Sequence, residues 1–327
     1  MLAAQVRRRV ARLEALEELS GIAAAVRPAV AQLRRSPRLA DALSGRGWLE
    51  HPAHPAYAAG PLGLWTGAFL FDALGLLPRR RPGRAGRGAG PATATMAARR
   101  AARTMTGAGV LAALPSAASG AHDWLDTDGA EQRLGVVHAA CNLAATGLYG
   151  LSWWQRHRGR HRFGALLGVA GAAAMTAGGH LGGELAYRRG VGPNTTAFQS
   201  GPTEWQPVIA AATLDDGRPH GVLVDEVALV AVRPADRRVG VLENRCTHRG
   251  GPLHEGELGD GGGCIVCPWH ASRFSLADGA VLGGPASVPQ PAYETRIRDE
   301  QVEVRRVEAG ALRRNVRSAE RALPRSP

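Results

Sequence analysis

The sequence contains no lysine, few cysteines and few aromatic residues. All 40 residues counted as Lys or Arg are arginine, against 28 Asp and Glu, and the formal net charge is +12. Four cysteines in 327 residues are too few for a disulfide scaffold. Residues 2–19 are too charged to supply the apolar core of a secretory signal. These features exclude a small disulfide-rich secreted protein, and the length allows two domains.

The positive charge is unevenly distributed along the chain. Residues 1–202 contain 24 Arg and 11 acidic residues, whereas residues 203–306 contain 11 Arg and 15 acidic residues. A nucleic-acid-binding protein would carry its basic surface on the folded recognition domain. Here the arginines stand between apolar runs, so the charge indicates a membrane protein, and no nucleic-acid partner is expected.

Residues 1–60 are predicted to form a helical, amphipathic N-terminal region. Spacings of three and four residues between apolar positions predict helices over residues 2–19 and 22–35. The apolar positions of the first helix are Leu2, Val6, Val10 and Leu13. The region either packs on the rest of the chain or lies on a membrane surface.

Residues 61–185 are predicted to form a four-helix transmembrane domain. The four apolar stretches are residues 61–77, 104–121, 134–154 and 163–183, and the only charged side chain in them is Asp72. A bilayer crossing takes roughly 17–25 residues, and abundant Ala and Gly suit close helix contacts in lipid. A soluble, Ala-rich four-helix bundle is the alternative, although soluble helices normally keep a polar stripe.

The connections between these stretches predict a multi-pass topology in the cell membrane. Residues 78–103 contain eight Arg and residues 155–162 contain four, whereas residues 122–133 are acidic with one Arg. Because positive loops stay in the cytoplasm, the first and third connections are expected there and both termini outside.

From residue 186 onward, the pattern of apolar residues changes. Residues 186–202 are predicted to be a linker, residues 203–306 a β domain and residues 307–327 a polar tail. Short apolar alternations broken by Gly, Pro and Asp are typical of antiparallel strands. The segments are residues 222–232, 239–244 and 294–305.

Two short motifs in the β domain carry potential metal ligands. Cys246 and His248 form a C-x-H pair, and Cys267 and His270 form a C-x-x-H pair after eighteen intervening residues, 249–266. By spacing alone, the four side chains could bind structural zinc or a [2Fe–2S] cluster with mixed ligands. A C-x-H pair is unusual for zinc, whose loop ligands are usually two to four residues apart.

The segments CTHRGGPL and CPWHAS resemble the two cluster loops of Rieske [2Fe–2S] domains. The resemblance extends from Trp205 to about Arg306 and implies an antiparallel β fold holding one cluster. It also implies that the two thiolates bind one iron and the two imidazoles the other. The implied ligand pairs are Cys246 with Cys267 and His248 with His270.

The resemblance also suggests supporting residues. Gly251 would let backbone N–H groups approach the sulfides, Trp269 would cover the cluster, and Ser272 could donate a hydrogen bond to it. Ordinary loop packing is the alternative for Trp269 and Ser272. Rieske proteins of cytochrome bc complexes carry an additional Cys in each loop, where this chain has Gly251 and Trp269. The chain is therefore similar to the ferredoxin or oxygenase-associated branch, and the remaining loop cysteine, Cys264, is expected to be a buried strand residue.

The membrane half resembles a family of predicted four-helix membrane proteins of unknown function, on residues 51–75 and 178–192. Ionisable side chains inside a bilayer are functional candidates, and here they are Asp72, His138 and His180. Two histidines on facing helices could ligate a haem or line a quinone pocket. Hydrogen bonding within the bundle is the alternative.

Together these features predict a membrane-anchored Rieske protein that carries single electrons. Its redox partner would be a quinol, a haem, a reductase or an oxygenase, and no oxygenase catalytic domain is visible. A redox-sensing module, whose cluster state acts on the bundle, is the alternative. Iron–sulfur clusters are normally inserted in the cytoplasm, whereas the loop charges favour termini outside, so the sequence leaves the side of the Rieske domain open.

Overall fold

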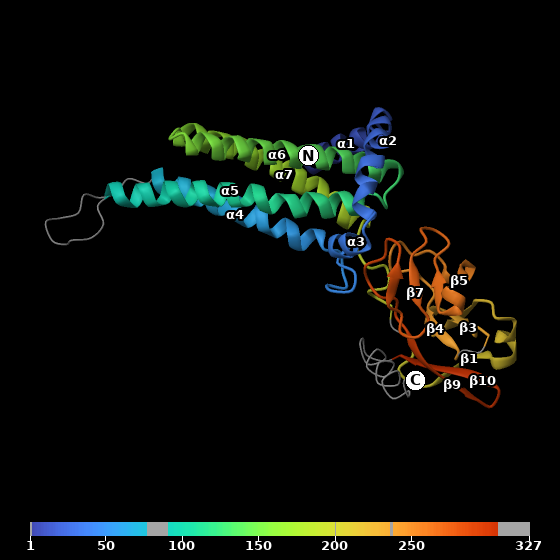
Figure 1. Cartoon of the computed structure of the whole chain (residues 1–327). Helices are drawn as coiled ribbons and strands as arrows, with labels where there is room; N and C mark the ends of the chain where they lie inside the picture. The colour runs from blue at the N-terminus through green and yellow to red at the C-terminus, as the bar shows by residue number, and fades with distance from the viewer. Residues whose placement is uncertain (1, 77–90, 200, 236–237, 307–327) are drawn as a thin grey trace. The chain divides into compact units, whose positions relative to one another are not determined.

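The computed structural model describes residues 2–76, 91–199, 201–235 and 238–306. The chain divides into two compact units (Figure 1). The first comprises Met1–Ser44 with Ala53–Val191, and the second comprises Gly45–Pro52 with Gly192–Pro327. The predicted polar tail and residues 78–90 of the first positive connection lie outside the described residues.

The first unit is helical throughout its described residues. A short N-terminal group precedes four long helices, and the described residues of the four apolar stretches all fall inside those helices. The N-terminal elements are α1 (Leu2–Glu14), α2 (Glu18–Val30), a 3-10 turn (Ala31–Arg34) and α3 (Pro37–Ser44). The long helices are α4 (His54–Leu76), α5 (Pro91–Trp124), α6 (Gly129–His157) and α7 (His161–Gly183), the last followed by a π-helical turn (Glu184–Arg188).

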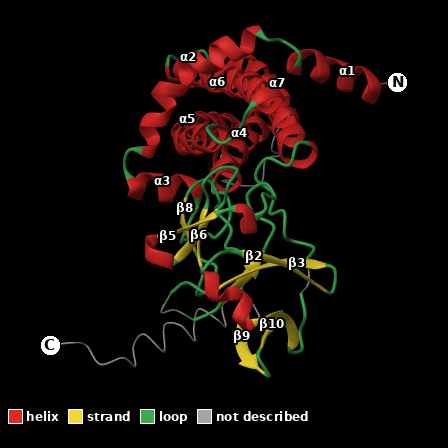
Figure 2. Ribbon diagram, turned by 90° about the vertical axis from the view of Figure 1, so that its right-hand side faces the viewer, coloured by secondary structure: helices red, strands yellow, loops and turns green. Residues whose placement is uncertain are grey.

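The four long helices form a bundle, which Figure 2 shows close to end-on. Helix α4 packs mainly on α5, α6 packs mainly on α7, and α5 also contacts α6. Trp65 of α4 stacks on Tyr149 of α6, with 4.1 Å between ring centroids. Any side chain at Gly109 would collide with the Trp65 indole. The small residues therefore let the helices approach closely enough for large rings to fill the bundle centre.

Large apolar side chains also cover the outside of the bundle. Examples with exposed fractions of 63–69% are Leu111, Leu114, Leu143 and Leu166. By length and mean hydropathy, two described helical segments qualify as candidate membrane spans: Gly129–His157 with 1.3 and His161–Arg188 with 1.2. Helices α4 and α5, which the sequence also predicts to cross the membrane, do not meet this criterion over their described residues.

The second unit is an antiparallel β domain of short strands. Strands β2, β3, β4, β9 and β10 confirm the strands predicted from apolar alternation, whereas β1 and β5–β8 were not individually predicted. The three sheets have the orders β1-β10-β9, β2-β3-β4 and β5-β6-β7-β8. The strands are β1 (Gln206–Ala210), β2 (His220–Val224), β3 (Val227–Val232), β4 (Gly240–Glu243), β5 (Glu257–Gly259), β6 (Cys264–Val266), β7 (Arg273–Ser275), β8 (Val281–Gly283), β9 (Tyr293–Arg298) and β10 (Gln301–Arg306).

Strands β3 and β4 are buried on both faces. Successive strand residues point to opposite sides, so Leu242 enters one apolar cluster and Val241 the other. The first cluster, which includes Ile265 and Phe274, also contains Cys246 and Cys267. The predicted metal site therefore lies directly on a hydrophobic core.

The predicted fold class, a helical bundle followed by an antiparallel β domain, is confirmed.

A segment that the sequence assigned to the N-terminal region belongs to the second unit. Residues Gly45–Pro52 group with the β domain, and Arg46 Nη1 donates to the carbonyl of Gly284 at 3.1 Å. The segment leaves α3 through Gly45 and Gly47, whose φ values of 79° and 81° permit the sharp change of direction.

Candidate metal centre

Two loops of the β domain carry the predicted ligands. The first follows β4 and contains Cys246 and His248, and the second connects β6 to β7 and contains Cys267 and His270. Both thiols are buried and both imidazoles are half-buried. No disulfide links the two cysteines.

The two loops share one hydrogen-bond frame. Cys246 accepts at its carbonyl from Gly250 N, and its own N–H donates to Gly251 O, at 2.8 and 2.9 Å. In the second loop, Cys267 O accepts from Ala271 N at 3.0 Å, and Cys267 N donates to Ser272 O at 2.8 Å. The fourth residue after each cysteine has a positive φ, 78° at Gly250 and 57° at Ala271. The same tight turn thus presents each cysteine, despite the different spacing of the histidines.

Replacement of Ala271 by glycine is expected to stabilise the β domain by about 0.5–1 kcal/mol, because Ala271 has the left-handed backbone that disfavours a side chain. Thermal unfolding of the full chain measures the effect. Ala277→Gly is the matched control, since Ala277 is also exposed in a turn but is not among the residues with positive φ. It is expected to be neutral or destabilising. A melting temperature lowered by Ala271→Gly would contradict the interpretation.

Backbone N–H groups surround both thiols. Those of His248 and Arg249 point to the Cys246 sulfur, and those of Trp269 and His270 to the Cys267 sulfur. A hydrogen bond from Cys246, aided by the latter two N–H groups, lowers the pKa of the Cys267 thiol, whereas the same hydrogen bond and burial raise the pKa of the Cys246 thiol. Because the thiolate is the form that binds metal, this environment suits a metal–sulfur centre.

The imidazoles form a second pair. The rings of His248 and His270 are nearly perpendicular, at 88°, with centroids 5.0 Å apart. Across the described part of the chain, no three His, Cys, Asp or Glu side chains group as ligands of one metal ion. A thiol pair beside an imidazole pair fits a two-iron cluster with mixed ligands.

The three supporting candidates have different environments. A Cβ at Gly251 would lie 2.9 Å from Cys267 Sγ and 3.0 Å from Trp269 Cγ, so no side chain fits there. Trp269 is 57% exposed and its ring lies 6.5 Å from that of His270. Ser272 is buried, and its hydroxyl accepts from Ala286 N at 3.1 Å. The exposure of Trp269 leaves the imidazole side of the site open to a partner.

Other residues that hold the loops were not predicted from the sequence. Gln290 is buried, accepts from Thr247 N at 3.0 Å, and donates to the carbonyls of Glu243 and Arg245 at 2.6 and 2.7 Å. Thr195, within the predicted linker, donates its hydroxyl to Cys246 O at 2.7 Å. Gln290 stands between Pro289 and Pro291 in the sequence. This is a weak signal, because only the packing of the domain shows what the amide contacts.

Cys264 confirms the expectation of a buried strand residue. It is fully buried in β6, and its thiol donates to the Asp260 carboxylate at 3.3 Å. Burial raises the pKa of the Cys264 thiol. Cys264 is therefore held as a neutral thiol away from the Cys246–Cys267 pair.

In the helical unit, the hydrogen-bond partner of Asp72 is Arg156, which lies in the predicted connection of residues 155–162. Arg156 Nη1 and Nη2 donate to its two carboxylate oxygens at 2.7 and 2.6 Å. The Arg156 side chain is 2% exposed, and its Nε donates to Ser152 Oγ at 3.1 Å. Asp72, an ionisable candidate of the membrane half, is therefore paired, because α6 continues through Arg156 and brings the guanidinium to its carboxylate.

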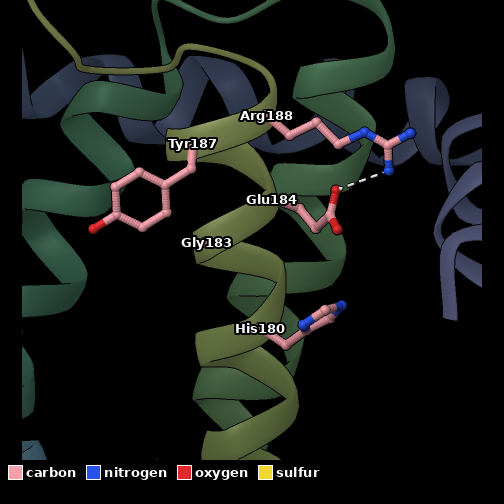
Figure 3. Close-up of a pocket in the computed structure, with 5 residues that line it drawn as sticks. All are labelled: His180, Gly183, Glu184, Tyr187 and Arg188. Atoms are coloured by element: carbon pink, nitrogen blue, oxygen red, sulfur yellow. Dashed lines mark hydrogen bonds and ion pairs between the residues drawn. The ribbon is translucent and has the colours of Figure 1, made fainter. Parts of the chain in front are cut away.

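The two candidate histidines of the bundle lie in different surroundings. His138 shares a hydrogen bond with the Gly178 carbonyl at 2.8 Å, and the imidazole beside it is that of His54, with centroids 6.4 Å apart. His180 lines a separate surface hollow of about 290 Å³ with Glu184, Tyr187 and Arg188 (Figure 3). The hydrogen bond of His138 fits the alternative of bonding within the bundle, and ligation of a haem by these two histidines stays a prediction.

Two family models match the chain. The Rieske [2Fe-2S] domain matches residues 204–294, and a family described as a predicted membrane protein (DUF2231) matches residues 50–195. The first match contains both site loops, and the second contains the four long helices.

Individual relatives match the β domain. The anthranilate 1,2-dioxygenase ferredoxin subunit of Burkholderia cepacia is 30% identical over 101 residues, which are 31% of this chain and 91% of the ferredoxin. The 3-chlorobenzoate-3,4-dioxygenase oxygenase subunit of Comamonas testosteroni is 33% identical over 95 residues, 29% of this chain and 21% of that subunit. The chain thus spans about a fifth of the length of that subunit.

A solved structure matches the same region. The ferredoxin of carbazole 1,9a-dioxygenase from Nocardioides aromaticivorans IC177 is 27% identical, with a TM-score of 0.30. The match covers 32% of this chain and 98% of that ferredoxin.

Proposed function

Because the chain belongs to the Rieske [2Fe–2S] family through residues 204–294, we propose that it is a membrane-anchored carrier of single electrons. The second unit is a Rieske ferredoxin-like electron-transfer domain with a [2Fe–2S] cluster as its cofactor. The observation that carries the proposal is the matched pair of loops, which presents two buried thiols beside two half-buried imidazoles.

In this proposal, Cys246 and Cys267 hold one iron, and His248 and His270 hold the other. When bound, such a cluster supplies one-electron chemistry at about −150 to +300 mV, against about −400 mV for plant-type ferredoxins. Backbone N–H groups point to both thiols, and together with the hydrogen bond from Cys246 they lower the pKa of the Cys267 thiol toward its ionised, ligating form. Gly251 leaves room beside the Cys267 sulfur that any side chain would occupy.

The imidazole side provides the route for electrons to a partner. His248 and His270 are half-buried, whereas the thiols lie on the hydrophobic core. The neighbouring Trp269 ring is 57% exposed, and exposed aromatic rings are favoured contacts at protein interfaces. We therefore propose that a redox protein docks over these three side chains, as a reductase or oxygenase would, or that a quinol approaches them.

Membrane anchoring is supported by the helical unit. Only 22% of the residues in the apolar 18-residue stretch of each candidate span are buried inside the protein, so most of the apolar side chains there need another covering. The DUF2231 match, described as a predicted membrane protein, includes all four long helices. The proposal places these helices in the cell membrane, with α4 and α5 completing the bundle around the two more apolar spans.

Electron paramagnetic resonance on washed membranes that contain the full chain, reduced with dithionite, tests the proposal. A mixed-ligand two-iron signal is expected, and Cys246→Ser and His270→Ala should each abolish it. Cys264→Ser is the matched control, since Cys264 is equally buried but lies outside the proposed ligand set. A protein that retains zinc and no iron after anaerobic preparation would overturn the cluster assignment, and a signal found only in the soluble fraction would overturn the anchoring.

A further inference from the structure

The β domain buries a carboxyl group that its proposed ligand set does not use. Glu243, at the end of β4, is 0% exposed, and neither of its carboxylate oxygens has a hydrogen-bond partner among the described residues. Within the same part of the chain, the buried hydroxyl of Tyr293 on β9 also lacks a partner. Buried polar groups are nearly always hydrogen-bonded, so an unpartnered carboxyl in this position calls for a functional explanation.

Several charged or titratable groups surround Glu243. Tyr293 approaches from β9, Arg306 from β10 and Arg245 from the following loop, and β3 offers only apolar residues. The Arg306 guanidinium instead donates to Gln199 O at 2.8 Å. The arginines therefore attract the ionised carboxylate only from a distance, and burial raises the pKa of Glu243 to about 7.

Glu243 is also connected to the first ligand loop. It precedes Cys246 by three residues, which is at most about 10 Å of extended backbone, and its side chain lies on the same face of β4 as that of Val241, opposite to Leu242. Gln290 donates to the backbone carbonyls of Glu243 and Arg245 and accepts from Thr247 N. Two unit charges about 10–15 Å apart still interact by more than thermal energy at an effective dielectric constant of about 20.

We propose that Glu243 is a proton-binding site coupled to the redox centre, so that the protein takes up a proton when it takes up an electron. When bound, the cluster would take the electron from a one-electron donor, with one iron changing from ferric to ferrous. The added negative charge favours transfer of a proton from water to the Glu243 carboxylate, which becomes a neutral carboxylic acid. By linkage, the protonated carboxyl favours reduction to the same extent. This inference rests on the proposed cluster ligation.

Potentiometric titration of the full chain between pH 5.5 and pH 8.5 tests the coupling. The equilibrium constant for reduction of wild type is expected to fall about tenfold as Glu243 ionises. Glu243→Gln, which mimics the neutral acid, should remove this dependence and keep the affinity for electrons seen in wild type at low pH. Glu257→Gln is the control, because Glu257 is exposed on β5.

The outcomes separate this inference from the proposed function. Glu243→Gln could show the two-iron signal and keep the pH dependence of reduction seen in wild type. That dependence would then arise from other groups, for example the ligand imidazoles, and this inference alone would be overturned. Absence of the signal in wild type would overturn the proposed cluster as well. If Glu243→Gln does not fold, infrared difference spectra of wild type decide: reduction at pH 7 should produce a protonated-carboxyl band, and no such band would contradict the proposal.

The stability of the domain provides an independent readout. The pKa of Glu243 is raised from 4.5 to about 7 in the folded state, so the folded chain holds the proton more tightly than the unfolded chain. The contribution of Glu243 to the free energy of unfolding is greatest below pH 4.5 and is lost as the pH rises through about 7. Relative to Glu243→Gln, wild type should therefore melt at lower temperature at pH 8 than at pH 5.

Discussion

Replacement of Asp72 by alanine is expected to destabilise the helical bundle by about 3–5 kcal/mol. Among the described residues, Asp72 provides the only carboxylate bonded to Arg156, whose side chain is 2% exposed, and the change removes it. Ser152 would remain as its single side-chain partner. An uncompensated buried charge is costly, and more so where lipid rather than water surrounds the helices.

Thermal unfolding in detergent, followed by the helical circular dichroism signal, measures this effect. Glu184→Ala is the matched control, because it also breaks an ion pair with an arginine, but Arg188 is 52% exposed. Such a pair contributes about 0–1 kcal/mol. The double variant Asp72→Leu with Arg156→Leu should recover much of the lost stability, since no charge remains buried. Equal losses from Asp72→Ala and Glu184→Ala would show that the buried pair has no special role.

Replacement of Gly251 by valine is expected to prevent stable cluster binding. The new Cβ would lie 2.9 Å from the Cys267 sulfur and 3.0 Å from Trp269 Cγ. Real Cβ contacts are essentially never that short, so a ligand loop must move. Movement of a cysteine by even a few tenths of an ångström disturbs a site whose metal–ligand distances are fixed within about 0.2 Å. Iron content per chain is expected to fall several-fold.

Visible absorbance and iron analysis of the purified full chain check this prediction. Gly283→Val is the matched control, because a Cβ at Gly283 would meet only Arg273 side-chain atoms, the nearest at 3.4 Å. It should retain the iron content of wild type. Full iron content in Gly251→Val would mean that the two loops adjust freely, and that the close approach of Gly251 to Cys267 is not required for the site.

The sequence predicted elements well where their residue pattern is long and regular. The apolar stretches lie within α4–α7, and the alternating segments became β2–β4, β9 and β10. Strands β5–β8 have three residues each, too few for an alternation to be recognised. Their pairing depends on neighbouring strands rather than on a local pattern, because each is stabilised only by cross-strand contacts.

The candidate site was predicted only as far as its ligand types and spacing allow. The C-x-H and C-x-x-H motifs identify the side chains that can bind metal. The common turn around Cys246 and Cys267, by contrast, appears in the backbone hydrogen bonds and in the positive φ of Gly250 and Ala271. Gln290 joins the site from more than forty residues beyond Glu243, and such a contact has no local sequence pattern.

By itself, the sequence determined the chemistry of the protein: a sulfur and imidazole donor set, and apolar helices that need a non-aqueous covering. These properties follow from residue type and spacing, which are local. Only the tertiary structure decided which charges are paired and which are buried alone. Asp72 and Arg156 are separated by 84 residues and meet because two helices pack together. Glu243 lies at a strand end, where an acidic residue would ordinarily be solvated, and it is buried because other strands cover both faces of β4.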